Sequence, residues 1–498
     1  MSSVKFGWSE KPLVPKGRSV NLAGQFYERI TDEVRDELCV TALAIESGDA
    51  SAIFCACDLV STSQILLEKV RELLLVKDPA FPVEYVITSA IHTHTAPAYK
   101  NRSDSTAMSG SALNILERYM PADVAYEKLV DDDSEKLFDG VEAYEYIAAR
   151  IADAAFEAWT NRAEGKYAAG FGRAAVGMCR RVCYDDGSAK MWGDTNMANF
   201  TELEGGNDSG IELIFIADEN EKLTGVVANV ACPSQVLEHR NFMSADYWGD
   251  VKKLLRAKYG EEIFLLPLCS AAGDQCPRDM IRWVEPETPI NDPNIERHNP
   301  PTRGADPSMF DIKGCELVAR RIATEIFFAY EDVTSYSSEA ILVHKNIKMN
   351  VPLRRVTIAE KDHALAQIDN FFKTHKGNIN FMDTARMHIY AGTVARYDIQ
   401  QKMDLDEIEI HVLRFGDFAI ATNPYELFLD YGNQIRARSL AKQTILVQLS
   451  CGSRGYLPTE KAEKGSHYSA YVSSGTTGHV GGEMLVRKTL TEINSMWK

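Results

Sequence analysis

The stretch ASAIFCACDLVSTSQILLEKVRELLLV, residues 50–76, runs from a short apolar segment into an amphipathic one. Its first part, SAIFCACDL at 51–59, is apolar and bounded by polar residues, a pattern typical of a buried strand. Its second part repeats Leu66, Val70 and Leu73 at helical spacing, after hydroxyl residues that can cap a helix. A strand that leads directly into an amphipathic helix is typical of an α/β fold.

The next segment, VEYVITSAIHTH at 83–94, has the apolar character of a second strand. Asp58 would then follow the first strand, and His92 and His94 would stand at the end of the second. In open α/β sheets, ligands bind at the carboxyl ends of the strands. We therefore expect a functional site at this edge of the sheet.

Further along, the chain alternates between helix-like and strand-like periodicity without internal repeats, low-complexity tracts or a convincing linker. This pattern predicts one large mixed α/β domain over residues 1–498. The expected helices cover 144–159, 312–330 and 357–374 and the C-terminal segment, and the expected strands lie within 211–232, 261–274 and 408–424.

The composition limits the classes of function. The chain has 498 residues, of which 45% are hydrophobic, so it can bury a large core, and its formal net charge of −17 provides no electrostatic footprint for nucleic acid or anionic membranes. None of the ten cysteines forms a CxxC pair, the N-terminus has no apolar leader, and no run of about 18 apolar residues occurs. These features predict a cytoplasmic protein without nucleic-acid partners or stable membrane association.

The HTH triplet at 92–94 is the first candidate constellation. In a strand, residues two apart face the same side, so His92 and His94 could offer two nitrogens to one metal ion. Neutral imidazole is the commonest metal ligand and suits zinc. The alternative is a pair of loop histidines without a metal.

The stretch CSAAGDQCPRD at 269–279 is the second constellation, a strand end of small residues followed by Asp274, Cys276 and Arg278. Such a loop allows a substrate to approach the backbone closely. Cys276 could act as a nucleophile only if a base or a cation stabilised its thiolate. The alternative is a tight turn that contains a packed cysteine.

Three later stretches complete the candidates. Glu426 follows a strand and a proline turn, where a carboxylate is otherwise a helix N-terminal charge, and Tyr456 lies in the glycine loop GSRGYLPTEK. The stretch 285–308 is rich in proline and asparagine and is either a surface loop or a lid.

Taken in order, these motifs resemble those of the neutral/alkaline non-lysosomal ceramidase family, from about residue 20 to the end of the chain. The resemblance implies the fold of that family's N-terminal catalytic domain. The segments that carry it are CDLV (57–60), IHTHTAP (91–97), ACPSQ (231–235), SADYWGD (244–250), GDQCP (273–277), NPYELF (423–428) and GYLPT (455–459).

The resemblance implies a zinc amidase in which Cys276 stands where ceramidases have a serine, and in which Arg180 or Arg181 lies near an arginine of the site. Tyr456 matches the second tyrosine of the family's late loop. The full candidate site comprises His92 and Glu426 as metal ligands, His94, Asp274, Cys276 and Tyr456 as catalytic residues, and Arg180, Arg181 and Arg278 as substrate-binding residues.

The chain departs from the family at two expected zinc ligands. The second zinc histidine aligns with Pro233, and the zinc-binding tyrosine aligns with Ser453. A catalytic zinc ion can manage with three protein ligands and a water molecule. Candidate replacements for the histidine are Cys232, Gln235 and His239.

The chain also ends about 40 residues after Tyr456, which leaves no room for the family's C-terminal immunoglobulin-like domain. We therefore expect a metal-dependent hydrolase, amidase-like, that uses one zinc-type ion on a soluble, polar small molecule. Two alternatives are a lyase or isomerase acting on a carbohydrate- or cyclitol-like ligand, and a binding protein without activity. A homo-oligomer is plausible because large cytoplasmic enzymes often form one.

Overall fold

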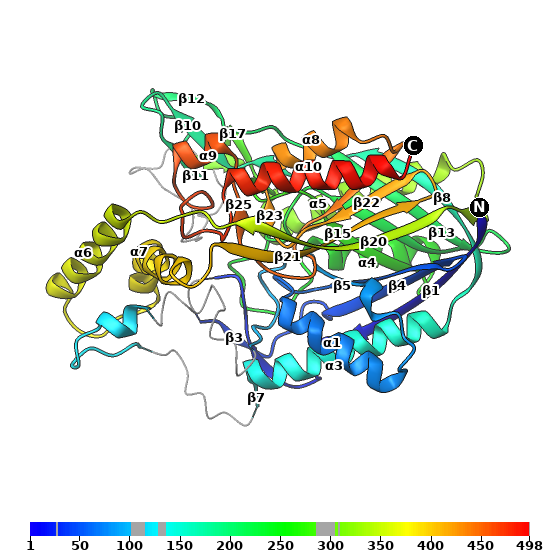
Figure 1. Ribbon diagram of the computed structural model, residues 1–498, viewed down its shortest axis with the longest axis horizontal. Helices are drawn as coiled ribbons and strands as arrows, with labels where there is room; N and C mark the ends of the chain where they lie inside the picture. The colour runs from blue at the N-terminus through cyan, green and yellow to red at the C-terminus, as the bar shows by residue number, and fades with distance from the viewer. Residues whose placement is uncertain (26–27, 101–114, 128–135, 285–303, 307–308, 498) are drawn as a thin grey trace.

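Two β-sheets stack face to face in the computed structural model, and helices cover both outer faces (Figure 1). The structure describes residues 1–25, 28–100, 115–127, 136–284, 304–306 and 309–497. The sheets pack through apolar side chains such as Ile53 and Phe215 of the first sheet and Ile420 of the second. The mixed α/β class expected from the sequence is confirmed.

The first sheet has nine strands in the order β15-β14-β13-β8-β1-β4-β5-β6, and β19 pairs with β1. Most neighbours are antiparallel, but β14 with β15 and β5 with β6 are parallel. The strands are β1 Ser2–Pro12, β4 Cys39–Ser47, β5 Ala50–Cys57, β6 Val86–Ala90, β8 Ala163–Arg173, β13 Gly210–Asp218, β14 Leu223–Val230, β15 Phe264–Cys269 and β19 Glu339–Ala340.

The stretch 50–76 forms β5 and then helix α1 (Gln64–Lys77), which leads through the short helix η1 (Val83–Tyr85) to β6. The N-cap of α1 is Ser63, whose hydroxyl accepts a hydrogen bond from the backbone N–H of Leu66 at 3.1 Å. Because β5 and β6 run parallel, their carboxyl ends lie side by side. This strand–helix–strand unit therefore brings the histidine segment to a sheet edge, as predicted.

The second sheet has the order β20-β21-β22-β24, with Gly416 in a left-handed conformation (φ 57°) in the turn between β21 and β22. Its inner face joins the core of the first sheet, and its outer face packs on helices through residues such as Ile410, Leu446 and Leu485. The strands are β20 Leu342–Pro352, β21 Leu405–Phe415, β22 Phe418–Thr422 and β24 Gln443–Val447.

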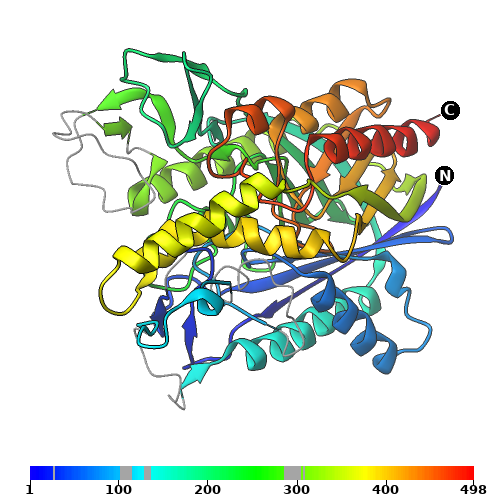
Figure 2. The same ribbon diagram turned by 60° about the vertical axis from the view of Figure 1, so that its left-hand side comes forward.

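Helices α1, α3, α4 and α5 pack on the outer face of the first sheet, and α8 and α10 pack on the second (Figure 1). Helices α6 and α7 lie side by side and project from one end of the molecule, as Figure 2 also shows. The bounds are α3 Gly140–Thr160, α4 Tyr247–Tyr259, α5 Asp311–Glu331, α6 Ile358–Thr374, α7 Phe381–Gln400, α8 Leu429–Arg438, α9 Glu460–Gly465 and α10 His479–Ser495.

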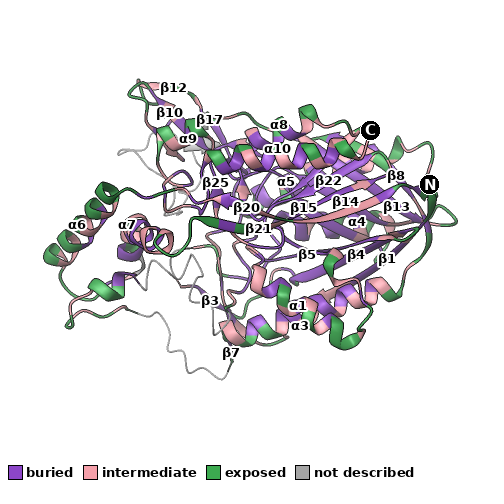
Figure 3. Ribbon diagram, in the orientation of Figure 1, coloured by how far each residue is buried: buried purple, intermediate pink, exposed green. Residues whose placement is uncertain are grey.

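Short ladders join the loops beyond the strand ends, whereas the long strands are buried between the helices (Figure 3). The ladders are β3-β2-β7 (Ile30–Thr31, Ser19–Asn21, Leu137–Phe138), β11-β10-β12 (Ala189–Met191, Arg181–Tyr184, Phe200–Leu203), β16-β9 (Gln275–Cys276, Met178–Cys179), β17-β18 (Asp279–Val284, Gly304–Asp306) and β23-β25 (Glu426–Leu427, Tyr456–Leu457).

One expectation from the sequence is corrected by the structure, and another falls mostly outside the described residues. The strand expected over 83–94 is confined to β6, so His92 and His94 lie beyond its end. The lid proposed at 285–308 lies outside the described residues, apart from β18. None of the helices in the described part of the chain is long and apolar enough to cross a membrane.

The close approach of β1 to α3 depends on Gly7. A Cβ atom at this position would lie 1.9 Å from the carbonyl oxygen of Ala158 in α3. We expect Gly7→Ala to lower the free energy of unfolding by about 1–3 kcal/mol, because overpacking forces the strand and the helix apart. Chemical denaturation of the two proteins measures this difference.

The matched control is Gly206→Ala, because a Cβ there would have no heavy atom within 4 Å. This variant should stay within about 0.5 kcal/mol of the wild-type protein. If both variants were equally stable, the packing of β1 on α3 would be wrong.

Candidate active site

The histidine loop follows β6 directly, and buried hydroxyl groups anchor it. Thr93 and Thr95 donate hydrogen bonds to the carbonyl oxygen of Ser244 at 2.7 and 2.8 Å. His92 adopts a left-handed conformation with φ 68°, so the alternation of a strand does not apply here. The rings of His92 and His94 nevertheless meet, with their Nε2 atoms 3.3 Å apart.

His92 is a buried, neutral imidazole. Burial lowers its pKa to about 4, although the carboxylate of Glu426 acts in the opposite direction. Its Nδ1 lies 2.7 Å from the carbonyl oxygen of Val60 and must donate to it, so its lone pair is on Nε2. That nitrogen lies 3.4 Å from Oε2 of Glu426.

His94 contacts a second carboxylate that the sequence analysis did not find. Its Nδ1 lies 3.2 Å from Oε2 of Glu238, which is buried. The guanidinium of Arg29 donates to the backbone oxygens of both His94 (2.6 Å) and Glu238 (2.7 Å), so the two residues are held together. No spacing rule signals Glu238, because its partner is 144 residues away in the sequence.

Glu426 and Tyr456 are neighbours in the parallel ladder of β23 and β25. The side chain of Tyr456 hydrogen-bonds to Glu426, and its ring contacts that of Tyr468 with 5.6 Å between centroids. Burial raises the pKa of Tyr456 well above its ordinary value and that of Tyr468 to about 12, so both hydroxyl groups keep their protons at neutral pH. Tyr468 is a second residue that the sequence analysis missed.

Arg180 joins the same cluster. It follows β9, and its Nη2 donates to the hydroxyl of Tyr456 at 3.1 Å and to the carbonyl oxygen of Gly273 at 3.0 Å. Its side chain is almost completely buried. Of the two neighbouring arginines considered for substrate binding, Arg180 is therefore the one that faces the candidate site.

Arg181 points in a different direction and belongs to the scaffold. Its guanidinium forms a bidentate ion pair with Glu204, at 2.5 and 3.1 Å. It also donates to the carbonyl oxygens of Ser466 (2.7 Å) and Tyr468 (2.9 Å). These contacts occupy the guanidinium, so Arg181 secures the loop that carries Tyr468.

Cys276 lies near Arg180 and Arg278 but is a poor nucleophile. Its thiol is fully buried and faces the carbonyl oxygen of Arg278 at 3.5 Å. Burial raises its pKa to about 12, although the guanidinium groups of Arg180 and Arg278 act in the opposite direction. The thiolate that nucleophilic attack requires is therefore scarce at neutral pH.

The side chains of Asp274 and Arg278 contact other parts of the chain than the histidine pair, namely the start of α8 and two aromatic rings. Asp274 accepts a hydrogen bond from the backbone N–H of Leu429 at 2.9 Å, which fixes the start of α8. Burial raises its pKa to about 6. Arg278 lies between two rings, 4.9 Å from the centroid of Trp192 and 4.2 Å from that of Phe310.

The proposed replacements for the missing zinc histidine lie in the loop that follows β14. Cys232 directs its sulfur to the carbonyl oxygen of Pro233 at 3.5 Å, and burial raises the pKa of its thiol well above the ordinary value. His239 stacks on Phe310 and lies 3.5 Å from a carboxylate oxygen of Asp311. Among the residues of this loop, Glu238 contacts the histidine pair, through Nδ1 of His94.

The donor atoms fit one zinc-type ion. The lone pair on His92 Nε2 faces the carboxylate of Glu426, and two acceptors 3.4 Å apart repel each other unless a cation lies between them. Imidazole and carboxylate are zinc ligands, and a carboxylate behind a neighbouring histidine is a common outer layer. His92 and Glu426 could therefore hold the ion, with His94 and the Tyr456 hydroxyl beside it.

A second group of potential ligands comprises Glu409, His411 and Cys451, whose ligand atoms all lie within 4.8 Å of one another. The carboxylate of Glu409 already forms a bidentate ion pair with Arg71 (2.5 and 3.0 Å). His411 contacts Glu409 through one ring nitrogen and His344 through the other, both at 2.8 Å. These are hydrogen-bond distances, so Arg71, Glu409, His411 and His344 form a buried hydrogen-bonded chain.

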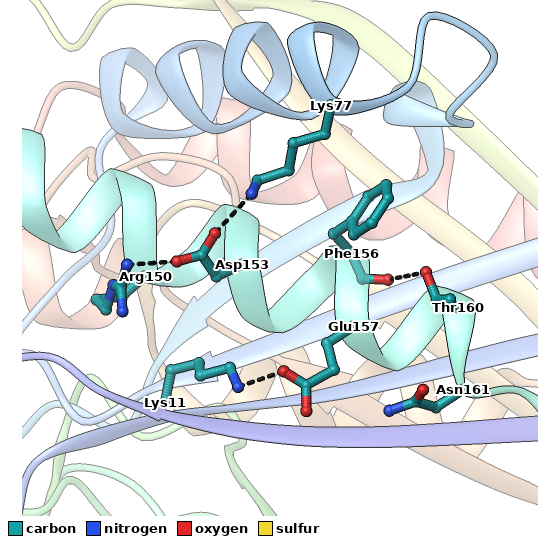
Figure 4. Close-up of a pocket in the computed structure, with 8 residues that line it drawn as sticks. All are labelled: Lys11, Lys77, Arg150, Asp153, Phe156, Glu157, Thr160 and Asn161. Atoms are coloured by element: carbon teal, nitrogen blue, oxygen red, sulfur yellow. Dashed lines mark hydrogen bonds and ion pairs between the residues drawn. The ribbon is translucent and has the colours of Figure 1, made fainter.

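A surface pocket beside α3 is separate from this chemistry (Figure 4). It is bordered by ion pairs that join Asp153 to Lys77 and Arg150, and Glu157 to Lys11. None of its eight lining residues belongs to the histidine cluster.

The fold is similar to that of solved neutral ceramidases. The neutral ceramidase from Pseudomonas aeruginosa matches with a TM-score of 0.67 and 13% identity, over 100% of this chain and 75% of that one. A structure described as ceramidase complexed with C2 matches with a TM-score of 0.66 and 13% identity, over 100% and 76%. No family model and no curated protein sequence matches the chain. The chain therefore has a neutral ceramidase-like fold.

The burial of Cys276 predicts slow chemical modification. We expect iodoacetamide to label Cys276 in the folded protein at pH 8 at least about tenfold more slowly than Cys183, because only a small fraction of the buried thiol is ionised. Cys183 is the internal control because it is partly exposed. Mass spectrometry of the digested protein measures both rates, and faster labelling of Cys276 would contradict the assignment.

Proposed function

We propose that this chain uses its neutral ceramidase-like fold as a metal-dependent hydrolase of amide bonds in a small, polar, soluble substrate. The observation that carries the proposal is the contact between two buried acceptors, His92 Nε2 and Glu426 Oε2, which a divalent cation would satisfy. His94, Tyr456 and Arg180 continue from this pair as one chain of polar contacts.

A bound divalent ion would lower the pKa of a water molecule and polarise the carbonyl group of the substrate. His94 is placed to hold or transfer a proton at Nε2, because Glu238 faces its other nitrogen. The hydroxyl of Tyr456 keeps its one proton, which it shares with Glu426 in the free protein and could donate to a carbonyl oxygen that gains negative charge once Glu426 holds the ion. Arg180 orients that hydroxyl at 3.1 Å.

Water is a better candidate for the nucleophile than Cys276. The thiol has a pKa of about 12, so it is almost entirely protonated at neutral pH. Its place near two guanidinium groups is consistent with a packing role beneath the substrate. No described contact favours the lyase or isomerase alternative, so we retain hydrolysis alone.

The charged side chains of the cluster support a polar substrate, because two carboxylates and a guanidinium are an unfavourable environment for a hydrocarbon chain. A cytoplasmic location remains part of the proposal. It is supported by the ten free cysteines, none of which forms a disulfide.

Metal analysis tests the proposal directly. We expect about one zinc ion per chain in the purified protein, and a loss of at least about nine-tenths of it in the double variant His92→Ala, Glu426→Ala, because both ligands are removed. The matched control is His363→Ala, an exposed histidine on α6. A wild-type protein without metal after reconstitution with zinc would contradict the proposal.

The role of His94 predicts a different phenotype. Replacing His94 with alanine should lower kcat/KM for an N-acyl amide by about 10²–10⁴-fold, the usual contribution of a proton-transferring group. The zinc content should remain close to one per chain, because His92 and Glu426 are intact. Loss of metal in this variant would instead make His94 a ligand.

A further inference from the structure

Arg180 is a buried cation without a carboxylate partner. Only 3% of the residue is exposed, and its guanidinium donates hydrogen bonds to neutral groups, the hydroxyl of Tyr456 and the carbonyl oxygen of Gly273. Its Nε has no hydrogen-bond partner, and in the described part of the chain no carboxylate lies within ion-pair distance. The hydroxyl of Tyr456 separates it from Glu426.

This arrangement is costly for the free protein. A buried charge without a counter-charge loses its hydration and gains little in return. The adjacent Arg181 is a buried guanidinium that the fold does neutralise, with a bidentate carboxylate from Glu204. The missing counter-charge of Arg180 therefore points to an anion that arrives with the ligand.

A second buried guanidinium, that of Arg278, also lies near Cys276. Arg278 is 1% exposed, and its plane is fixed between Trp192 and Phe310. Both Arg180 and Arg278 act on the thiol of Cys276 and lower its pKa against the effect of burial. The two guanidinium groups therefore both lie near enough to Cys276 to act on it, as does the carboxylate of Glu238.

One hydroxyl group connects Arg180 with the histidine side of the site. Tyr456 contacts both Glu426 and Arg180, and Glu426 faces His92. A ligand whose amide lies beside the histidines would thus reach Arg180 with its other end.

We infer that Arg180 forms a subsite for a carboxylate of the substrate, and that the substrates are N-acyl amino acids or related amides with one free carboxylate. A planar guanidinium binds a carboxylate through two parallel hydrogen bonds, and Arg180 still has an unused donor at Nε. The position of the amide in this inference rests on the proposed function, whereas the binding of the anion at Arg180 does not.

Isothermal titration calorimetry with N-acetylglycine and N-acetylglycinamide tests the subsite, because the two probes differ only in the charge of one end. We expect the wild-type protein to bind N-acetylglycine at least about tenfold more tightly. In Arg180→Met this preference should disappear, and in Arg180→Lys it should be reduced several-fold, since the charge remains but the two-pronged geometry is lost. The control Arg282→Met removes an arginine that is 75% exposed and should keep the full preference.

Equal affinity for the two probes, or no binding of either to the wild-type protein, would overturn the inference. Thermal unfolding shows whether Arg180→Met is folded, and if it is not, Arg180→Lys and the wild-type comparison decide. Failure of the proposed hydrolase is seen separately, as a protein that binds no zinc or releases no glycine from N-acetylglycine. A carboxylate preference without hydrolysis would support the subsite and reject the reaction.

Discussion

The backbone oxygen of Ser244 is the point on which the candidate site depends. It accepts the hydroxyl groups of Thr93 and Thr95, so the histidine loop cannot move independently of this segment. Two residues later, the carboxylate of Asp246 accepts the backbone N–H of Leu237 at 2.8 Å, next to Glu238. Residues 244–246, at the start of α4, thus fix both loops that meet at His94.

The site combines neutral and charged groups in a way that burial explains. Burial keeps His92 unprotonated, keeps the Tyr456 hydroxyl protonated and keeps Cys276 as a thiol. Carboxylates and guanidinium groups lie next to these neutral groups, as Glu426 does beside His92 and Arg180 beside Tyr456. Neutral groups that can accept or donate a proton therefore stand between fixed charges, which suits reactions in which charge develops on a bound substrate.

The local part of the fold could be predicted from the sequence, because apolar runs and helical periodicity are local signals. The unit β5–α1–β6 follows from the pattern of 50–76, whereas the stacking of the second sheet on the first depends on contacts between distant residues such as Phe6 and Phe415. A motif also indicated His92, whereas the family resemblance supplied the roles of Glu426 and of Arg180 or Arg181, without deciding between the two arginines. Glu238 could not be found in this way, since its position depends on how two loops fold against each other.

The loop that contains Pro233 takes part in the candidate site through a later residue. Five residues after this proline, the loop presents Glu238 to His94. The guanidinium of Arg29 donates to the backbone oxygens of both residues, so the carboxylate is held as firmly as the ring that it faces. Since the loop is anchored through its backbone, the position of Glu238 depends on the fold of the loop and not on the side chain at position 233.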